Sequence, residues 1–402
     1  MSCHPGLATP PLGGVGRPRT TWAPAPHGVS MELYIERDQL IRGLARVQGV
    51  VERRTTNPVL SHVLLSARGD SLQMTATDSA LTLVADYPAT VENAGELSVD
   101  AQRLFQIART LTDSTVHLSL SKANRLHIRC GKAEFNVVGS SPDDYPPVPT
   151  RDERARLVVV GGDLRRLIEE TLSSISADDN RYGLNGGHLE QITTDQGDSR
   201  LRLVTTDGSR LSWSEAPFEG NFGLGERMLV PRKALGEVRK LVDLDESEWT
   251  VSFGQRSAAF STEGLTLMLR LIDGEFPDYR QVLPSAAKRR VRVQRGPFTA
   301  ALKRVSIMAS DRNHSVRFAF DEDRLVMTAH NVDAGDVREE LPADLEGTPL
   351  FTGFNVRYFQ DILAATRGDE MVLELGEPLD PCLVRIPDRD DCMFVVMPMR
   401  LD

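Results

Sequence analysis

The chain has 402 residues, 40% of them hydrophobic and 26% charged, and its formal net charge is −10. This length suggests two to four domains of roughly 100–200 residues each. The composition excludes a wholly disordered chain and a uniformly basic nucleic-acid binder, and the lack of any charge-free window of about 18 residues excludes a membrane-spanning helix.

The first 30 residues differ in composition from the rest of the chain. They hold six Pro and five Gly but no Asp or Glu, and they lack the continuous apolar core of a secretory signal. We interpret residues 1–30 as a disordered N-terminal extension or a mis-assigned start, with the folded chain beginning at Met31. Four cysteines, none in a C-x-x-C pair, indicate a reducing, cytoplasmic location rather than a disulfide scaffold.

From Met31 onward, one set of landmarks recurs along the chain. Each repeat opens with a predicted helix, at 38–51, 163–176 and 297–310. We expect Asp163 to be the N-cap of the second of these helices and Pro297 to lie in the first turn of the third. A turn resembling T-x-D follows a strand at 75–78, 204–207 and 328–331.

Later in each repeat a strand runs into an amphipathic helix, at 97–111, 228–242 and 350–366. Proline-rich linkers close the first two repeats at 142–149 and 276–284. Short alternating segments between these landmarks predict strands with one buried face. The sequence therefore predicts an α+β fold of three related domains, each with two helices and about eight antiparallel strands, at 31–150, 155–284 and 288–402.

Positive charge is concentrated in the predicted helices. Together the six helices carry a net charge of +10, which leaves −20 on the rest of the chain. The simpler interpretation is a set of solvated helix faces. The alternative is one helix-lined concave surface that faces a polyanion, with strands as the outer layer. Because no zinc-finger, helix-turn-helix or RNA-recognition signature is present, the contacts would be to phosphates without sequence readout.

No catalytic motif is recognisable. The chain lacks a G-x-x-x-x-G-K-[ST] loop, H-E-x-x-H and G-x-S-x-G. His117 and His127 have no ligand-spaced partners, and we interpret 388–391 (DRDD) as a solvated loop rather than a metal site. Neither a cofactor nor a metal is predicted. The apolar C-terminus at 394–401 predicts a final edge strand or one wall of an apolar groove.

These segments also carry a family resemblance from Met31 to Leu401. The chain resembles the bacterial DNA polymerase III beta subunit, the beta sliding clamp. The matching segments are RYGLNG (181–186), TTDGSRL (205–211), VPRK (230–233), DGEFPDY (273–279), FNVRY (354–358) and VVMPMRL (395–401).

The resemblance implies a non-catalytic homodimer of three-domain protomers. The dimer would form a ring around double-stranded DNA, with helices inside and sheets outside, and would act as a DNA polymerase processivity factor. Implied partners are the replicative DNA polymerase alpha subunit, the clamp loader and other clamp-binding repair or replication proteins. The implied location is the cytoplasm, in association with the nucleoid and away from membranes.

The resemblance also implies three groups of site residues. The DNA-facing candidates are Arg54, Arg103, Arg109, Tyr182, Arg232 and Lys233. The ring-interface candidates are Phe135 and Val137 in the first domain and Ile307 and Met308 in the third. A partner-peptide groove between the second and third domains would use Leu184, Thr206, Gly208, Arg210, Leu211, Pro277, Val282, Tyr358, Leu383, Val395, Val396, Met397, Pro398, Met399 and Arg400.

Some positions depart from the family pattern. Gln281 stands where the family pattern has a basic residue beside the groove, and Ser209 where a larger His or Tyr is common, so the resemblance does not fix the peptide preference of this chain. Gly183 replaces a residue that is aromatic in some relatives, and Asp402 adds a charge at the groove edge. A hydrolase or nuclease using scattered carboxylates and a protein-binding scaffold are the rival hypotheses. Missing motifs disfavour the first, and charge segregation disfavours the second.

Overall fold

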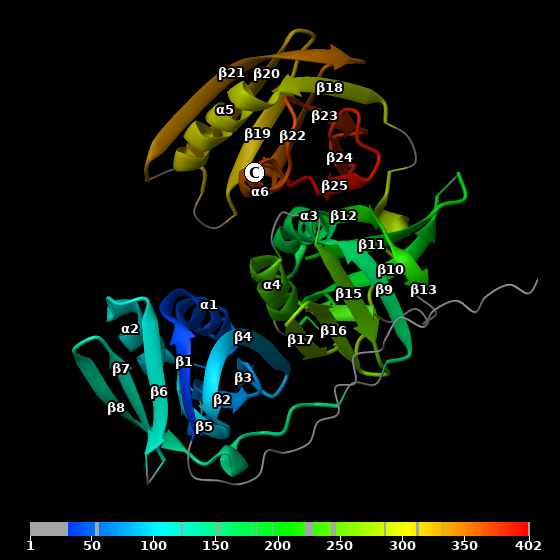
Figure 1. Cartoon of the computed structure of the whole chain (residues 1–402). Coiled ribbons are helices and arrows are strands. Elements are labelled where there is room, and N and C mark those ends of the chain that lie inside the picture. The colour runs from blue at the N-terminus through cyan, green and yellow to red at the C-terminus, as the bar shows by residue number, and fades with distance from the viewer. Residues whose placement is uncertain are drawn as a thin grey trace, which may run out of the picture.

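The structure is a computed structural model. It describes residues 31–400 except 53–55, 122–123, 151–152, 179, 182, 195, 222–227, 243–246, 285–286, 311–312 and 332. The N-terminal extension, Arg54 and Tyr182 lie outside the described residues. Three α+β repeats follow one another along an open arc (Figure 1).

The three repeats share one order of elements. Each runs strand, helix, a group of middle strands, helix and three final strands. The first contains β1 (Glu32–Glu36), α1 (Arg37–Val47), β2 (His62–Arg68), β3 (Ser71–Thr77), β4 (Leu81–Asn93), β5 (Gly95–Asp100), α2 (Ala101–Thr110), β6 (Thr115–Ser121), β7 (Arg125–Cys130) and β8 (Ala133–Ser140).

The second repeat has one additional short strand, β13. Its elements are β9 (Ala155–Val160), α3 (Gly161–Thr171), β10 (Gly186–Thr193), β11 (Ser199–Thr206), β12 (Arg210–Pro217), β13 (Glu219–Asn221), β14 (Met228–Pro231), α4 (Arg232–Leu241), β15 (Glu248–Phe253), β16 (Ser257–Thr262) and β17 (Leu265–Arg270).

The third repeat returns to the order of the first. Its elements are β18 (Arg289–Gln294), α5 (Arg295–Met308), β19 (Ser315–Phe320), β20 (Arg324–Asn331), β21 (Gly335–Glu346), β22 (Leu350–Asn355), α6 (Val356–Ala365), β23 (Glu370–Leu375), β24 (Cys382–Arg385) and β25 (Cys392–Val396). Over the described residues, each repeat therefore has two α-helices and eight or nine strands, which confirms the predicted fold class.

Strand pairing continues from one repeat into the next. At what we call the first junction, β4 of the first repeat pairs with β17 of the second. At the second junction, β12 of the second repeat pairs with β25 of the third. All pairings are antiparallel, and the strands form one sheet of 13 strands and another of 12. The sheets therefore hold the repeats together through backbone hydrogen bonds.

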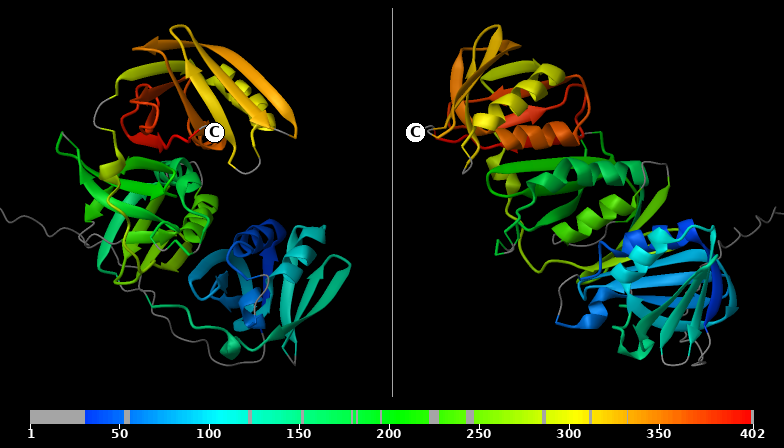
Figure 2. Two further views of the ribbon diagram at one scale, coloured as in Figure 1. Left: turned by 180° about the vertical axis from the view of Figure 1, so that it is seen from behind. Right: turned by 90° about the vertical axis from the view of Figure 1, so that its left-hand side faces the viewer.

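The helices lie on the concave side of the arc and the sheets on its outer side. Figure 1 shows the six helices following the inner edge, and the right-hand view of Figure 2 shows them in front of the sheets. Asp100 caps α2 and Asn355 caps α6, each accepting a hydrogen bond from a backbone N–H two or three residues later. None of the helices in the described part of the chain is long and apolar enough to cross a membrane.

Apolar side chains fill the space between the helices and the sheets. One buried cluster spans the first two repeats, and a second fills the third repeat. In the third repeat Phe318 lies against Phe354 and Phe359, with ring centroids 5.4 Å apart in both pairs. Cys382 and Cys392 belong to this cluster, so they pack as small apolar side chains, as the sequence indicated.

Two local expectations about helix ends are wrong. α3 begins at Gly161, so Asp163 lies in its first turn and pairs with Arg166 at 3.0 Å instead of capping the helix. The first helix ends at Val47 rather than at residue 51. Gly49 follows it at a point where a Cβ atom would meet the carboxylate of Glu237 from the second repeat, so α4 approaches the first repeat closely there. Pro297 does lie in the first turn of α5.

Candidate functional site

The helices of the concave face carry exposed basic side chains. Arg103 and Arg109 are exposed on α2, and Arg232 and Lys233 are exposed at the start of α4. Arg232 donates a hydrogen bond to the carbonyl oxygen of Ile175 at 2.6 Å. These four DNA-facing candidates therefore lie on helices that share one side of the molecule.

Lys233 has a second role that the sequence did not suggest. Its Nζ forms an ion pair with Asp78 of the first repeat and donates to the carbonyl oxygen of Val50 at 3.3 Å. The Asp78 side chain is only 8% exposed. Lys233 therefore connects the first two repeats on the helix side while leaving about half of its side chain in solvent.

Further basic residues of the inner helices were not among the candidates. Arg42 on α1, Lys303 on α5 and Arg357 on α6 are all exposed. The excess positive charge of the predicted helices was the sequence signal that pointed to these three residues. Together with the predicted residues they extend the basic surface over all three repeats.

The second junction brings together the residues predicted for the groove. Arg210 and Leu211 of β12 lie opposite Val396 and Val395 of β25. Beyond β25, the Met397 N–H donates to the carbonyl oxygen of Ser209 at 2.9 Å. The Met399 N–H donates to the carbonyl oxygen of Gly353 at 2.7 Å. The C-terminal segment is thus attached to both repeats.

An apolar cluster forms the interior of this junction. Its buried members are Val204, Leu211, Trp213, Tyr279, Leu383, Met393 and Val395, with Phe276 and Leu283 partly buried against them. Pro277 and Val282, from the linker, are exposed beside it, and Leu184, Met397, Pro398 and Met399 are partly exposed. Arg400 is exposed. Val396 is fully buried in the core of the third repeat, so its side chain is not accessible to a ligand.

Arg210 makes several polar contacts at the second junction. Its guanidinium pairs with Asp207 at 3.0 Å and with Asp361 of α6 at 2.6 Å, and it stacks over the Tyr358 ring at 4.5 Å. Thr206 Oγ1 donates to the Arg210 carbonyl oxygen at 2.7 Å. Gly208 has φ +86°, which few residues other than glycine adopt. The turn and α6 are therefore held together by one side chain.

The linker tyrosine is secured by a second polar group that the sequence did not reveal. Tyr279 donates to Glu190, accepts from Arg202 at 2.8 Å and is 4% exposed. Burial and the hydrogen bond to Glu190 raise the pKa of Tyr279. Arg202 also pairs with Glu215 and stacks on Trp213 at 4.4 Å. These contacts fix the linker against the second repeat.

The ring-interface candidates occupy opposite ends of the arc. Phe135 is partly buried on β8, and Ile307 is 76% exposed near the end of α5, beside Met308. Val137 is 5% exposed and points into the core, whereas its neighbour Val138 is 59% exposed. Because side chains alternate between the two faces of β8, the accessible valine is Val138 rather than Val137.

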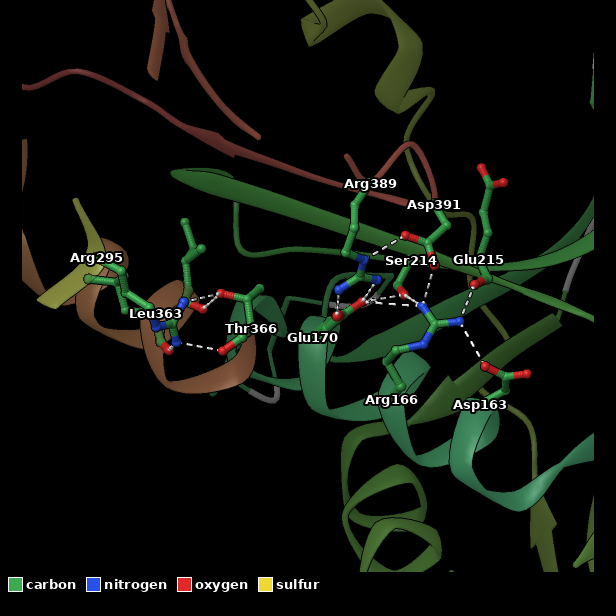
Figure 3. A network of polar contacts seen from close by, with 11 residues as sticks. Asp163, Arg166, Glu170, Ser214, Glu215, Arg295, Leu363, Thr366, Arg389 and Asp391 are labelled. Carbon is green, nitrogen blue, oxygen red and sulfur yellow. Dashed lines mark hydrogen bonds and ion pairs between the residues drawn. The ribbon is translucent and has the colours of Figure 1, made fainter. Parts of the chain in front are cut away.

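A network of ion pairs joins the second and third repeats on the face of β12 opposite the apolar cluster (Figure 3). Glu170 of α3 is 2% exposed, accepts from Arg389 at 2.6 Å and accepts from Ser214 at 2.6 Å. Arg166 pairs with Asp391 at 2.9 Å, and Arg389 pairs with Asp391 at 2.8 Å. We call Arg166, Glu170, Arg389 and Asp391 the Glu170 network.

The Glu170 network corrects the interpretation of 388–391 as a solvated loop at Arg389 and Asp391, whereas Asp388 and Asp390 are exposed as expected. Arg389 and Asp391 are each less than a quarter exposed. Burial opposes the charge on Asp391, but its hydrogen bond with Arg389 and its attraction to Arg166 outweigh burial, so the pKa of Asp391 is lowered. Over the described residues, no group of three or more His, Cys, Asp or Glu side chains is arranged to hold a metal.

Three family models match the chain almost end to end. They describe the N-terminal, central and C-terminal domains of the DNA polymerase III beta subunit, and they match residues 31–149, 159–278 and 280–400. The chain belongs to the DNA polymerase III beta subunit family. Its relatives are named sliding clamps, which are non-catalytic accessory subunits of DNA polymerase III, so the chain is not an enzyme.

Individual relatives agree with this assignment. The beta sliding clamp of Caulobacter vibrioides is 34% identical over 374 residues, covering 92% of this chain and all of the relative. That of Vibrio cholerae is 32% identical over 372 residues, with the same coverage. The crystal structure of the sliding clamp from Bartonella birtlesii bound to griselimycin is 33% identical and superposes with a TM-score of 0.88, again covering 92% of this chain and all of that one.

We predict that Glu170→Ala destabilises the second junction by about 1–3 kcal/mol, because the change removes the buried carboxylate to which Arg389 and Ser214 donate and leaves the partly buried Arg389 with Asp391 alone. Urea denaturation and hydrogen exchange of β25 would measure the effect. Glu169→Ala is the matched control, since Glu169 is one-third exposed and pairs with Arg165 on the helix surface, and it should cost less than about 1 kcal/mol. Equal effects of the two substitutions would show that the network does not hold the repeats together.

Proposed function

We propose that two copies of this chain form a closed ring around duplex DNA and tether the replicative polymerase to it. The protomer would consist of domains at 31–150, 155–284 and 288–402. The observation that carries the proposal is the strand-pairing rule of the two internal junctions. Applied between two chains, the same rule would pair a strand in the third repeat of one protomer with a strand in the first repeat of the other.

The rule pairs corresponding strands. In element order, β4, β12 and β21 correspond, as do β8, β17 and β25. The pairs β4–β17 and β12–β25 are made within the chain, which leaves β21 and β8. Over the described residues, 335–339 of β21 pair with β20 alone and 133–138 of β8 pair with β7 alone. Unpaired strand edges favour association, and a heterologous contact of this kind closes when the rotation is right.

The first junction also predicts the register of the missing pair. There Thr82 lies opposite Met268, and Leu83 opposite Leu267, both leucines being fully buried. The corresponding residues place Val337 of β21 opposite Phe135 of β8. Both are partly buried in the single chain, so pairing would complete their burial. The same register places Arg338 opposite Glu134, with opposite charges on the outer face.

The charge distribution supports DNA in the centre of such a ring. The inner helices carry the excess of basic residues in a chain whose net charge is −10. Phosphate contacts of this kind are independent of sequence and weak enough to exchange. A closed ring does not need tight contacts because it holds DNA by topology. Its position would be on the bacterial chromosome, within the cytoplasm.

The groove at the second junction supports the tethering role. Partly exposed methionines beside a buried apolar cluster suit an extended peptide with apolar anchors. A polymerase alpha subunit, a clamp loader or another clamp-binding replication or repair protein held there would stay near the DNA at high effective concentration. The polymerase would therefore rebind the primer end instead of diffusing away.

Charge reversal at the predicted ring interface tests closure. We expect Glu134→Arg or Arg338→Glu alone to raise the dimer dissociation constant at least about tenfold, because like charges then face each other. The two substitutions together should restore the dimer. Both side chains are more than half exposed, so the folded repeats should be unaffected, and Arg125→Glu on β7 is the control. Sedimentation would measure the dimer, and retention on circular but not linearised DNA after treatment with a clamp loader would report encirclement. An unchanged dimer dissociation constant in both single variants would contradict the predicted register.

The inner surface is tested by the salt dependence of DNA association. We expect the combined substitutions Arg103→Ala, Arg109→Ala and Arg232→Ala to make log affinity fall less steeply with log salt. The magnitude of the slope should decrease by about 0.9 for each phosphate that is no longer neutralised. Arg125→Ala, on a strand rather than an inner helix, should leave the slope unchanged. Fluorescence anisotropy with a short duplex would supply the slopes. Identical slopes for the triple variant and the unmodified chain would rule out a role for these arginines at the DNA.

The groove is tested by removing its accessible methionines. We expect Met397→Ala with Met399→Ala to weaken binding of the polymerase alpha subunit at least about tenfold, because interface energy is concentrated in a few anchoring side chains. The dimer should remain intact, since neither side chain lies in the proposed ring interface. Val160→Ala, which shortens an exposed apolar side chain on β9, is the control. Surface plasmon resonance would compare the three proteins, and unchanged polymerase binding would exclude the groove.

A further inference from the structure

The two internal junctions are equivalent residue by residue. At the first, the Arg270 N–H donates to the carbonyl oxygen of Ala80 at 2.9 Å; at the second, the Met397 N–H donates to the carbonyl oxygen of Ser209 at 2.9 Å. Ser79 at the first junction has φ +74°, and Gly208 at the second has φ +86°. The tight turn, the adjoining strand and the hydrogen bond are thus repeated. Each residue of the first junction can therefore be matched with a residue of the second.

A hollow opens at the first junction, in the place that corresponds to the predicted groove of the second. It has a volume of about 420 Å³. Four of its lining residues, Ser79, Thr82, Met268 and Arg270, correspond to the groove positions Gly208, Leu211, Val395 and Met397. The strand-pairing register places Ala259 where the second junction has Leu383. Smaller side chains on β16 therefore leave space that a leucine fills in the other junction.

The chemistry of this hollow differs from that of the groove. Among the residues that the structure describes, its lining contains two guanidinium groups, Arg256 and Arg270, and no carboxylate. The Arg256 side chain is 77% exposed, and Arg270 is exposed at the end of β17. Asp273 lies 4.0 Å from Arg256 but is itself 87% exposed and is not part of the lining. In a chain with ten more acidic than basic residues, this is a positively charged recess on the sheet side of the junction.

The size and the walls of the hollow indicate what it can accept. Pockets of about 300–1,000 Å³ suit an organic ligand or several side chains, whereas an inorganic anion would leave most of this space empty. Met268 and Ala259 supply an apolar wall, and both are buried. A ligand with an aliphatic side chain for this wall and carboxylates for the two arginines would match the recess in shape and charge.

We propose that the first junction is a second docking site, which takes an acidic, extended peptide from a partner protein. An aliphatic side chain of the peptide would lie against Met268, and flanking carboxylates would pair with Arg256 and Arg270. The site goes beyond the proposed function, because it uses the apolar groove only as a geometric comparison and requires neither ring closure nor DNA. A protomer would then hold two peptides of different chemistry at once.

A labelled acidic peptide tests the site. The probe is a fluorescein-labelled pentapeptide, Glu-Ala-Leu-Asp-Glu, titrated with the full chain and followed by fluorescence anisotropy. We expect saturable binding that Arg256→Glu with Arg270→Glu weakens at least about tenfold, since two charge-assisted interactions become repulsive. Arg367→Glu, a charge reversal at an exposed arginine after α6, should change the affinity less than about twofold.

Further variants separate the hollow from its surroundings. Ala259→Leu, which copies the side chain of the second junction, should fill the hollow and abolish binding while thermal unfolding stays unchanged. Met397→Ala should leave binding of this probe intact, so failure of the apolar groove and failure of this site are distinguishable. The neutral peptide Gln-Ala-Leu-Asn-Gln should bind more weakly than the acidic one.

Four results would overturn the proposal. The first is a lack of saturable binding at about 1 mM probe, and the second is a loss of affinity in Arg367→Glu equal to that in the double arginine variant. The third is binding that survives Ala259→Leu, and the fourth is complete displacement of the probe by inorganic phosphate at equal concentration. The last result would indicate an anion site rather than a peptide site.

Discussion

Backbone pairing across the repeat junctions is the constraint on which the rest of the structure depends. Each repeat ends in a strand whose edge would otherwise be exposed, and an exposed edge is a site of uncontrolled association. Here β17 satisfies its edge on β4 and β25 satisfies its edge on β12. Because the hydrogen bonds of a ladder fix direction and spacing, each junction turns the next repeat by a set amount. The helices then face inward, and contacts on the helix side, such as the ion pair of Lys233 with Asp78, add to the strand pairing.

The junctions share a backbone but differ in their side chains, and this difference separates structure from recognition. At the first junction Lys233 and Asp78 connect the repeats on the helix side. At the second, the Glu170 network does so, with a buried carboxylate between two guanidiniums. A buried charge is costly unless it is paired, so such a network penalises any arrangement that separates its members. The opposite face of the same strand pair carries Leu211 and Val395, beside the C-terminal methionines, and takes no part in this network.

The sequence predicted the parts of the fold that depend on local periodicity. The three repeats, the six helices and the apolar C-terminal strand follow from patterns within about 15 residues. Helix ends were less accurate, because buried apolar residues such as Val50 and Val51 continue the pattern beyond Val47, where α1 ends. The interior of the candidate site was harder still. Glu170 and Arg389 are 219 positions apart, and nothing beside Arg389 in the sequence distinguishes a surface loop from a buried ion pair. Val137 and Val138 are both valines, so only the pleat of β8 decides which of them is accessible.

Repetition also explains why one chain can present several kinds of surface. A repeated backbone supplies the same turn and strand pair at each junction, and substitutions within it alter shape and charge without altering the architecture. Leu383 and Ala259 occupy corresponding places, yet one belongs to a filled apolar cluster and the other lines a hollow. The basic excess of the helices follows the same logic, since it does not affect the ladder that joins the repeats. Selection on exposed positions can therefore change which partners bind, while the strand register keeps the arc unchanged.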